Sequence, residues 1–440
     1  MLTDLSQVRT TNYLKQLRGS VLYKAGAILA TFLAMPLMVR YLGVEVFGIW
    51  ATMLTLVSWV MLFDLGIGNG LKNKVAESLA RNDRAAAASY VSTAYVAIGS
   101  VSLVLLLALV VISGWLPWQV IFNTLAVSDA VLQEAVITLA CFVFINFWIS
   151  LVNQVFHGLQ SSAYVVLGQF VSNALALLLV FALYLFAASS LTHMVWAFGL
   201  ALIAANVTLS LILFRQHREL FPSVLAFDRG KVGSLLSLGV KFFVVQFAVI
   251  VIFMTDKILI SQLLGPAEVT PYEVLFKLFS LFTVAQGLIL APLWPAYSDA
   301  YARSDLEWIR KQLKKQIILA FALLLSAVAA ACLGPLIVHL WMGDAVNVSR
   351  PLYFMFALFI GLSVWNNVFA YFVNAIGKLS VQLVTALLAA CLNIPLSIFF
   401  VRDCGMGAEG VLLATVASLS IYGLVGPLEV YKLTRKTASC

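Results

Sequence analysis

Long apolar segments, separated by short polar or Gly- and Pro-containing stretches, follow one another along the chain. A helix needs about 20 mainly apolar residues to cross a bilayer. The segments are longer than barrel strands and lack a period of two, so they predict helices. Twelve transmembrane helices are predicted near residues 19–42, 46–65, 86–113, 131–155, 163–187, 192–214, 236–263, 272–294, 316–340, 350–373, 379–401 and 408–430.

The composition agrees with an all-α integral membrane protein. Hydrophobic residues make up 62% of the chain and charged residues only 10%, whereas soluble domains carry roughly 25% charged residues. The polar N-terminal stretch has no apolar core, so we expect no cleavable signal peptide. The five cysteines form no CxxC and the four histidines no HExxH, so no metal site and no cofactor is predicted.

The positions of the basic residues predict the orientation in the membrane. Of the 27 Lys and Arg residues, 20 fall in connections on one side, and only Arg40, Arg350 and Arg402 fall on the other. The positive-inside rule then places both termini in the cytoplasm of a multi-pass protein. The net charge of +8 therefore reflects membrane topology, and we expect no nucleic acid as a partner.

An internal repeat divides the chain into two halves. Leu42-Gly43 and Leu264-Gly265 lie 222 positions apart, and so do the matching segments VAESLARND (75–83) and YSDAYARSD (297–305), which predict short amphipathic cytoplasmic helices. A constant offset indicates duplication, and each half then holds six spans. We expect two six-helix lobes related by pseudo-twofold symmetry, at 1–218 and 236–440, joined by a cytoplasmic linker at 219–235.

Four charged residues interrupt the first two spans of the second half. Asp256 and Lys257 point about 100° apart on a helix, so they do not simply neutralise each other. Glu273 and Lys277 lie on the next span at a similar depth, since each helix residue rises about 1.5 Å. The hairpin therefore allows the pairs Lys257–Glu273 and Asp256–Lys277.

The same charges have a structural and a functional interpretation. They either hold two helices together as a salt-bridge cluster or line a path for an anionic headgroup or a coupling ion. At offset 222 their counterparts are uncharged: Ala34, Met35, Ala51 and Thr55. The first half builds its hairpin without ions at these places, which favours the functional interpretation.

Residues 19–83 carry a resemblance to a known family. The segment from Gly19 to Asp83, together with MTDKILISQLLG (254–265) and residues 372–401, resembles bacterial O-antigen and polysaccharide repeat-unit flippases of the Wzx type. These belong to the multidrug/oligosaccharidyl-lipid/polysaccharide exporter superfamily. The resemblance implies two lobes around a lumen and alternating access. It also implies an undecaprenyl-pyrophosphate-linked oligosaccharide as cargo, moved to the periplasmic leaflet of the inner membrane, with a polysaccharide polymerase and a chain-length regulator as partners.

The resemblance and the chemistry of each side chain nominate the site residues. Cationic side chains suit pyrophosphate, and the guanidinium of Arg40 can bind phosphate oxygens in a bidentate manner. Lys24 lies on the first span, which lines the cleft in the resembling family. Snorkelling of the side chain to the membrane surface also explains the position of Lys24. Amides suit sugar hydroxyls, although they also bridge helices. The predicted substrate-binding residues are Lys24, Arg40, Lys257, Lys277, Asn153, Gln154, Asn366 and Asn367, and the predicted ion-coupling residues are Asp64, Asp256 and Glu273.

Competing functions remain open from the sequence. A cation-coupled multidrug exporter of the same superfamily predicts acidic residues in the cavity, and the chain offers acidic and basic residues alike. A membrane-embedded polysaccharide polymerase or ligase, an enzyme, predicts a large periplasmic loop with charged residues, which no predicted connection provides. The chain has no GxxxxGK[ST], so we expect a proton or sodium gradient, rather than ATP, to drive transport.

Overall fold

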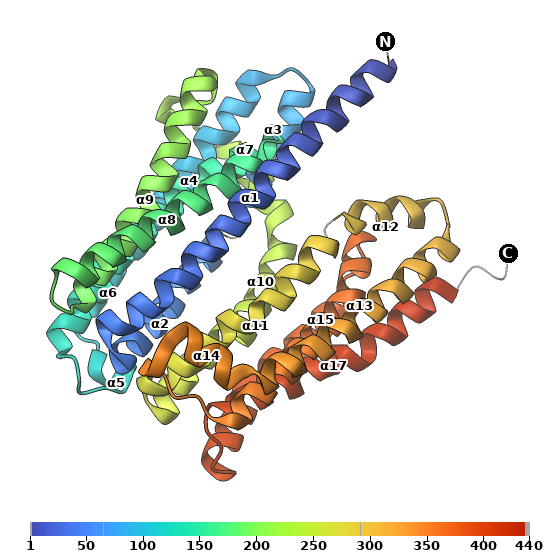
Figure 1. Ribbon diagram of the computed structural model, residues 1–440. Helices are drawn as coiled ribbons and strands as arrows, with labels where there is room; N and C mark the ends of the chain where they lie inside the picture. The colour runs from blue at the N-terminus through green and yellow to red at the C-terminus, as the bar shows by residue number, and fades with distance from the viewer. Residues whose placement is uncertain (1, 65, 291, 436–440) are drawn as a thin grey trace. The chain divides into compact units, whose positions relative to one another are not determined.

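The computed structural model describes residues 2–64, 66–290 and 292–435, and its side chains for 21–59, 63–64, 66–236, 254–290 and 292–435 (Figure 1). The described part is helical and contains no strand. Its α-helices are α1 Leu2–Leu42, α2 Val44–Ser58, α3 Ile67–Ala80, α4 Arg84–Ser113, α5 Trp118–Phe122, α6 Asp129–Ile149, α7 Leu151–Gly158, α8 Ser162–Phe186, α9 Leu191–Gln216, α10 Arg229–Leu264, α11 Val269–Leu290, α12 Leu293–Ala302, α13 Leu306–Cys332, α14 Gly334–Met342, α15 Arg350–Ala375, α16 Ser380–Ile398 and α17 Ala408–Arg435.

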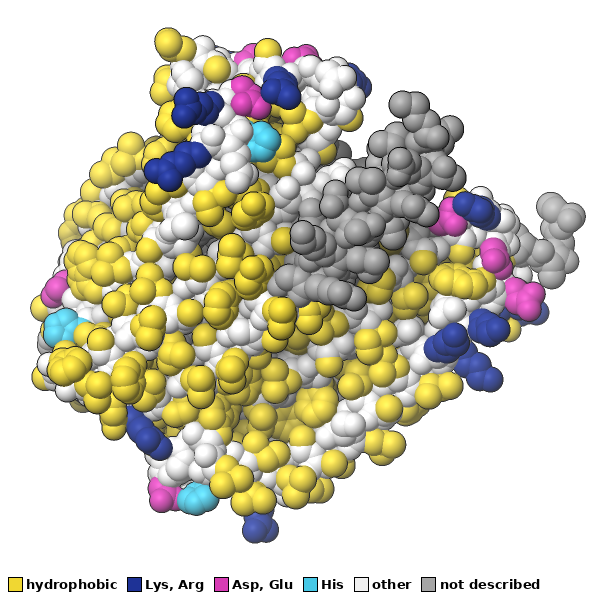
Figure 2. Space-filling model, turned by 45° about the horizontal axis from the view of Figure 1, so that its top comes forward, with side chains coloured by type: hydrophobic (Ala, Val, Ile, Leu, Met, Phe, Trp, Pro, Cys, Tyr) yellow, Lys and Arg dark blue, Asp and Glu magenta, His cyan; other side chains and the backbone are white. Residues whose placement is uncertain are grey.

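Ten helical segments of the described residues are long and apolar enough to cross a membrane. Together with the shorter apolar α2 and with α10, which covers the predicted seventh span, they confirm the twelve predicted apolar helices. Figure 2 shows hydrophobic side chains over most of the visible surface, with Lys and Arg gathered in small groups near its margins. Exposed Phe186 and Leu325 belong to this apolar surface, which suits contact with lipid chains.

Two predicted spans are interrupted. The span expected at 316–340 is two helices, because α13 ends at Cys332 and α14 begins at Gly334. Pro335 explains the break, since it has no N–H to donate to the preceding turn. The span expected at 131–155 is α6 and α7, separated at Ser150, whose hydroxyl donates to the carbonyl of Phe147 at 3.1 Å.

The predicted eighth span ends early. The sequence predicts a helix over 272–294, but α11 already ends at Leu290, and α12 begins at Leu293 after Pro292. The chain therefore changes from one helix to the next at Pro292 instead of continuing as a single span. The basic residues 310–315, expected in a connection, instead lie in the first turns of α13.

The chain forms two compact units, the first comprising Met1–Val46 and Val57–Phe243, the second Phe47–Leu56 and Val244–Cys440. In the first unit α1 packs on α8, α8 on α9, α9 on α6, and α3 on α4 and α7. A core of fully buried aliphatic residues, including Leu71, Val91 and Val155, joins α3, α4 and α7. Glycines permit close helix approach there, since a Cβ on Gly199 would lie 2.2 Å from the ring of Phe142.

The second unit is built around α15, which packs on α11, α12, α13 and α17, while α16 packs on α17. Phe279 of α11 stacks on Phe356 of α15 with ring centroids 5.8 Å apart, and both are fully buried. A Cβ on Gly334 would lie 2.2 Å from the ring of Tyr353, so this glycine allows α14 to approach α15. These helices position the buried polar residues of the candidate site.

The predicted repeat recurs as local structure at the same offset. Gly43 and Gly265 both have positive φ, 80° and 101°, and Asn82 and Ser304 have φ of 57° and 58°. In both units the next helix is capped by an aspartate: Asp83 accepts from the Ala86 N–H at 2.8 Å and Asp305 from the Trp308 N–H at 3.1 Å.

The ion pairs of the two short helices are duplicated as well. Arg81 pairs with Glu77 at 2.8 Å, and Arg303 pairs with Asp299 at 3.0 Å. A hydrogen bond from Lys74, followed by the charges of Lys74 and Arg81, lowers the pKa of Glu77. The duplication that the sequence indicates is thus retained down to individual side chains.

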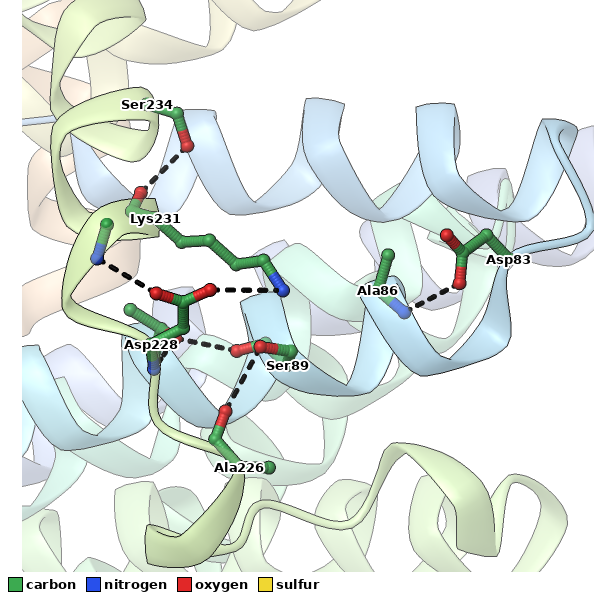
Figure 3. A network of polar contacts seen from close by, with 9 residues as sticks. Asp83, Ala86, Ser89, Ala226, Asp228, Lys231 and Ser234 are labelled. Carbon is green, nitrogen blue, oxygen red and sulfur yellow. Dashed lines mark hydrogen bonds and ion pairs between the residues drawn. The ribbon is translucent and has the colours of Figure 1, made fainter.

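The segment before α10 is bound to α4 within the first unit (Figure 3). The hydroxyl of Ser89 donates to the carbonyl of Ala226 at 3.1 Å, and Thr93 Oγ1 accepts from the backbone N–H of Asp228 at 3.1 Å. Lys231 pairs with Asp228 at 3.6 Å. Hydroxyl-bearing residues of α4 therefore hold this segment along the helix.

Candidate ion and headgroup site

A buried carboxylate marks the centre of the candidate site in the second unit. Asp256 lies on α10 and is only 2% exposed. The hydroxyl of Tyr272 on α11 donates to Asp256 Oδ2 at 2.7 Å. Thr415 Oγ1 on α17 lies 3.1 Å from both carboxylate oxygens. Hydroxyl donors from two further helices thus surround the carboxylate, which compensates part of its burial.

A fourth helix extends this network. Asn393 of α16 is fully buried, and its Nδ2 donates to Thr415 Oγ1 at 2.8 Å. The Thr255 hydroxyl lies 3.4 Å from Asn393 Oδ1, and the Val411 carbonyl oxygen lies 3.3 Å from Thr415 Oγ1. Oxygen atoms of a carboxylate, a hydroxyl and a backbone carbonyl therefore lie close together. Such oxygen atoms are suitable ligands for a hard cation, and the carboxylate can also bind a proton.

A row of alternating charges lies beside this network. Lys257 Nζ is 2.6 Å from Glu273 Oε2, and Lys277 Nζ is 4.0 Å from Glu273 Oε1. Lys257 Nζ also lies over the ring of Phe276, 5.8 Å from its centroid. The side chain of Lys257 is 14% exposed, whereas that of Lys277 is 39% exposed. Glu273 therefore neutralises Lys257 closely and leaves Lys277 the more available cation.

The structure brings all four predicted charges together but pairs them unequally. The predicted contact Lys257–Glu273 is present. The contact considered for Asp256 and Lys277 is not among the ion pairs of the described residues; Asp256 is bonded to Tyr272 and Thr415 instead. The reason is helical geometry, because neighbouring residues point about 100° apart and so meet different partners.

Tyr272 and Thr415 were missed as partners because both are uncharged in a span. The only sequence signal for Tyr272 is its place at the start of the same hairpin, 16 residues after Asp256. Thr415 lies 159 residues from Asp256, and no pattern links the two positions.

The uncharged counterparts at offset 222 are buried. Ala34, Met35, Ala51 and Thr55 are all at most 7% exposed. The Thr55 hydroxyl donates to the Ala51 carbonyl at 2.9 Å, so it satisfies its polarity within its own helix.

Asp64 occupies a different place, at the end of a 3-10 turn, Trp59–Asp64, before α3. Its Oδ1 accepts from the backbone N–H of Gly68 at 2.9 Å. A Cβ on Gly68 would lie 3.3 Å from both Asp64 carboxylate oxygens and from Cγ of Gln154, so Asp64 and Gln154 meet at this glycine. The Gly-rich stretch after Asp64 thus forms the start of α3 and is bonded to Asp64.

The predicted amides take part in bonds between helices. Asn153 Nδ2 donates to Asn206 Oδ1 at 3.1 Å, and Asn206 Nδ2 donates to Asn146 Oδ1 at 2.7 Å. Asn366 Nδ2 donates to the Leu419 carbonyl at 3.0 Å, and Asn367 Nδ2 donates to Gln286 Oε1 at 3.0 Å. The Oδ1 atoms of Asn153 and Asn366 are buried and accept no hydrogen bond.

The remaining predicted cations are exposed. Lys24 and Arg40 both lie on α1 with exposed side chains. Neither forms an ion pair within the described part of the first unit. Lys241, a further charge within a predicted span, lies outside the described side chains.

The chain shares its fold with a solved multidrug resistance transporter. A solved inward-facing MATE family transporter of the MOP superfamily superimposes with a TM-score of 0.80, covering 93% of this chain and 96% of that chain at 15% identity. A family model described as polysaccharide biosynthesis protein matches residues 19–301. Since this is more than half of the chain, the chain belongs to that family, which confirms the resemblance seen in residues 19–83.

Two related proteins are similar to this chain along most of its length and of their own. The chain is 24% identical to a putative O-antigen transporter of Salmonella typhi, covering 90% of each. It is 23% identical to the membrane protein EpsK of Bacillus subtilis, covering 92% of this chain and 81% of that protein.

Proposed function

We propose that the chain is a lipid-linked oligosaccharide flippase. It moves undecaprenyl-pyrophosphate-linked O-antigen or other polysaccharide repeat units from the cytoplasmic to the periplasmic leaflet of the bacterial inner membrane by alternating access. The family match and the printed name of the Salmonella typhi relative support a polysaccharide transporter. The multi-pass helical architecture supports a membrane cargo.

The observation that carries this proposal is the Lys257–Glu273–Lys277 row. Lys257 is held at 2.6 Å by Glu273, while Lys277 is 4.0 Å away and 39% exposed. A partly exposed ammonium with a distant counter-ion can bind phosphate oxygens. Lys277 therefore meets the pyrophosphate, and Glu273 and Lys257 set its position. The Oδ1 atoms of Asn153 and Asn366 are buried in this conformation, and they accept hydrogen bonds from sugar hydroxyls when alternating access exposes them.

Transport is coupled to a proton or sodium gradient at Asp256. Its carboxylate is enclosed by Tyr272 and Thr415 hydroxyls and has no cation within ion-pair distance among the described residues. A buried carboxylate with neutral partners gains from binding a cation or a proton. Glu273 and Asp64 are weaker carriers, because Glu273 already pairs with Lys257 and Asp64 already accepts from Gly68.

The test is complementation of a strain that lacks its O-antigen flippase. Lys277→Gln is expected to abolish O-antigen display at normal protein level, and Lys277→Arg to restore part of it. Lys378→Gln is the matched control, since Lys378 is an exposed cation bonded only to the Tyr301 hydroxyl in the described part of the chain. Normal display by Lys277→Gln would contradict the assignment of Lys277.

The second candidate function is cation-coupled multidrug export, which the MATE fold favours. Multidrug export would use the same ion site at Asp256, but it would not require Lys277, because its cargo carries no pyrophosphate. Drug resistance that depends on Asp256 but not on Lys277, in cells without O-antigen synthesis, would favour the exporter over the flippase.

A polysaccharide polymerase and a chain-length regulator are the protein partners expected of such a flippase. Both termini are assigned to the cytoplasm on the distribution of Lys and Arg. Reporter fusions at either terminus test this orientation directly.

A further inference from the structure

The first turns of α13 carry a cluster of four cations, Arg310, Lys311, Lys314 and Lys315, called here the α13 basic face. All four side chains are exposed. At 100° per residue they cover one side of the helix, opposite Ile309, Leu313 and Ala320, which are buried against the second unit. The α13 basic face therefore points away from the helices of the second unit that bury the opposite side of α13.

The α13 basic face has no acidic partner in the described part of the chain. None of its four residues forms an ion pair there, whereas Lys74, Arg81 and Arg303 each do. Arg310 and Lys314, like Lys311 and Lys315, are like charges four residues apart, an arrangement that destabilises a helix. Cations near a helix N-terminus also oppose the helix dipole. The positive-inside rule accounts for cations on this side of the membrane, and because no described carboxylate pairs with these four, they remain free to bind an external anion.

The repeat shows what covers the same face in the first unit. At offset 222 the four positions are Ala88, Ser89, Ser92 and Thr93 of α4. There the segment before α10 covers the helix: Ser92 Oγ accepts from the Ser223 N–H at 3.1 Å, as Ser89 and Thr93 bind Ala226 and Asp228 (Figure 3). On α13 the small hydroxyl residues are replaced by long cations, and no described segment covers them.

The surroundings of the α13 basic face identify the occupant. Directly after Lys315, the same side of the helix continues as exposed Ile318, Phe321 and Leu325, at 59%, 54% and 70%. These apolar residues belong to a helix long and apolar enough to cross a membrane, so they face lipid chains. The cations directly before them then lie at the level of the lipid headgroups.

We propose that the α13 basic face binds the headgroup of an anionic phospholipid, such as phosphatidylglycerol, while the acyl chains lie along Ile318, Phe321 and Leu325. Juxtamembrane clusters of four or more cations bind anionic lipid in this way. The site is separate from the Asp256 network and concerns the surrounding bilayer, not the cargo. It holds whether or not the proposed flippase function does.

The experiment titrates the purified full-length protein, in a neutral detergent, with phosphatidylglycerol or phosphatidylethanolamine and follows the first bound lipid by native mass spectrometry. The variant K311Q/K314Q/K315Q is expected to bind phosphatidylglycerol about tenfold more weakly, because each surface cation contributes to anionic lipid binding. Its binding of phosphatidylethanolamine should not change. The matched control is R215Q/R218Q/R229Q, which removes three exposed cations from the first unit and its linker.

Two results would overturn the proposal: unchanged phosphatidylglycerol binding by the α13 variant, or an equal loss in the control. Wild-type protein provides a test that does not depend on a variant. Its preference for phosphatidylglycerol should fall as salt rises from about 0.05 to about 0.5 M, because screening shortens the reach of the charges. A preference unaffected by salt would contradict a headgroup site, and displacement by inorganic phosphate at equal concentration would contradict a lipid site.

Discussion

Tyr272 and Asp256 are joined by a 2.7 Å hydrogen bond between the phenol and carboxylate Oδ2, across the turn between α10 and α11. Both residues are at most 2% exposed. The phenol is therefore a neutral donor to a carboxylate inside the protein. Because adjacent helix residues point about 100° apart, Asp256 meets this phenol while Lys257 meets Glu273.

The Asp256→Asn variant should fold but lose coupled transport. An amide keeps the size of the side chain and can still accept from Tyr272 and Thr415, but it binds neither a proton nor a sodium ion at neutral pH. We expect the rate of transport in proteoliposomes to fall at least about tenfold, which corresponds to a rise of about 1.4 kcal/mol in the transport barrier. Imposing a sodium gradient and a pH gradient separately on wild-type protein shows which ion drives transport. Equal transport by wild type and variant would refute coupling at Asp256.

The Tyr272→Phe variant tests the phenol alone. Removing a hydrogen bond to a charged group costs about 1.5–3 kcal/mol, so the melting temperature in detergent should fall. Without the phenol, the carboxylate of Asp256 has one hydrogen-bond donor fewer, so a bound ion contributes more to its stabilisation. Added coupling ion should therefore raise the melting temperature of the variant more than that of wild type. Phe276, an existing phenylalanine one turn later on α11, shows that the helix accepts this side chain. An unchanged melting temperature would show that the bond contributes nothing.

Glu273 and Lys257 should behave as a coupled pair. Glu273→Gln leaves Lys257, 14% exposed, with no close counter-ion, and breaking such a pair costs about 3–5 kcal/mol when it is fully buried. Residual exposure reduces this cost. The double variant Glu273→Gln/Lys257→Gln should recover much of the lost stability. Additive losses in this double-mutant cycle, measured by thermal unfolding, would mean that the ion pair does not stabilise the hairpin.

The glycine at position 70 should tolerate no side chain. A Cβ there would lie 2.3 Å from the carbonyl oxygen of Leu235, an atom of the backbone that cannot rotate away. Gly70→Ala should therefore lower the unfolding free energy by about 1–3 kcal/mol. Gly233→Ala is the control, since nothing lies within 4 Å of its Cβ. Similar melting temperatures for the two variants would show that the α10 segment can shift away from α3.

The sequence by itself determined the twelve apolar helices, the duplication and the four charges of the α10–α11 hairpin. Span length follows from bilayer thickness, and charge in a span is visible wherever it occurs. The repeat at one offset extends to local detail as fine as the caps formed by Asp83 and Asp305, because caps depend on neighbours in the chain. The break at Ser150 was missed because it lies within an apolar run, and the break after Leu333 was missed although Gly334-Pro335 marks it, since the apolar run on both sides is long enough for one span.

Only the tertiary structure decided what each charge is bonded to. Asp256 meets Thr415, 159 residues away, and through it Asn393, because α10, α16 and α17 pack together. Helix geometry fixes the angle between Asp256 and Lys257, but the packing of whole helices decides which side chain fills each direction. The same holds for α4 and α13. At four matched positions α4 carries Ala88, Ser89, Ser92 and Thr93 where α13 carries Arg310, Lys311, Lys314 and Lys315, and only packing shows that chain covers this face of α4 while no described segment covers it on α13.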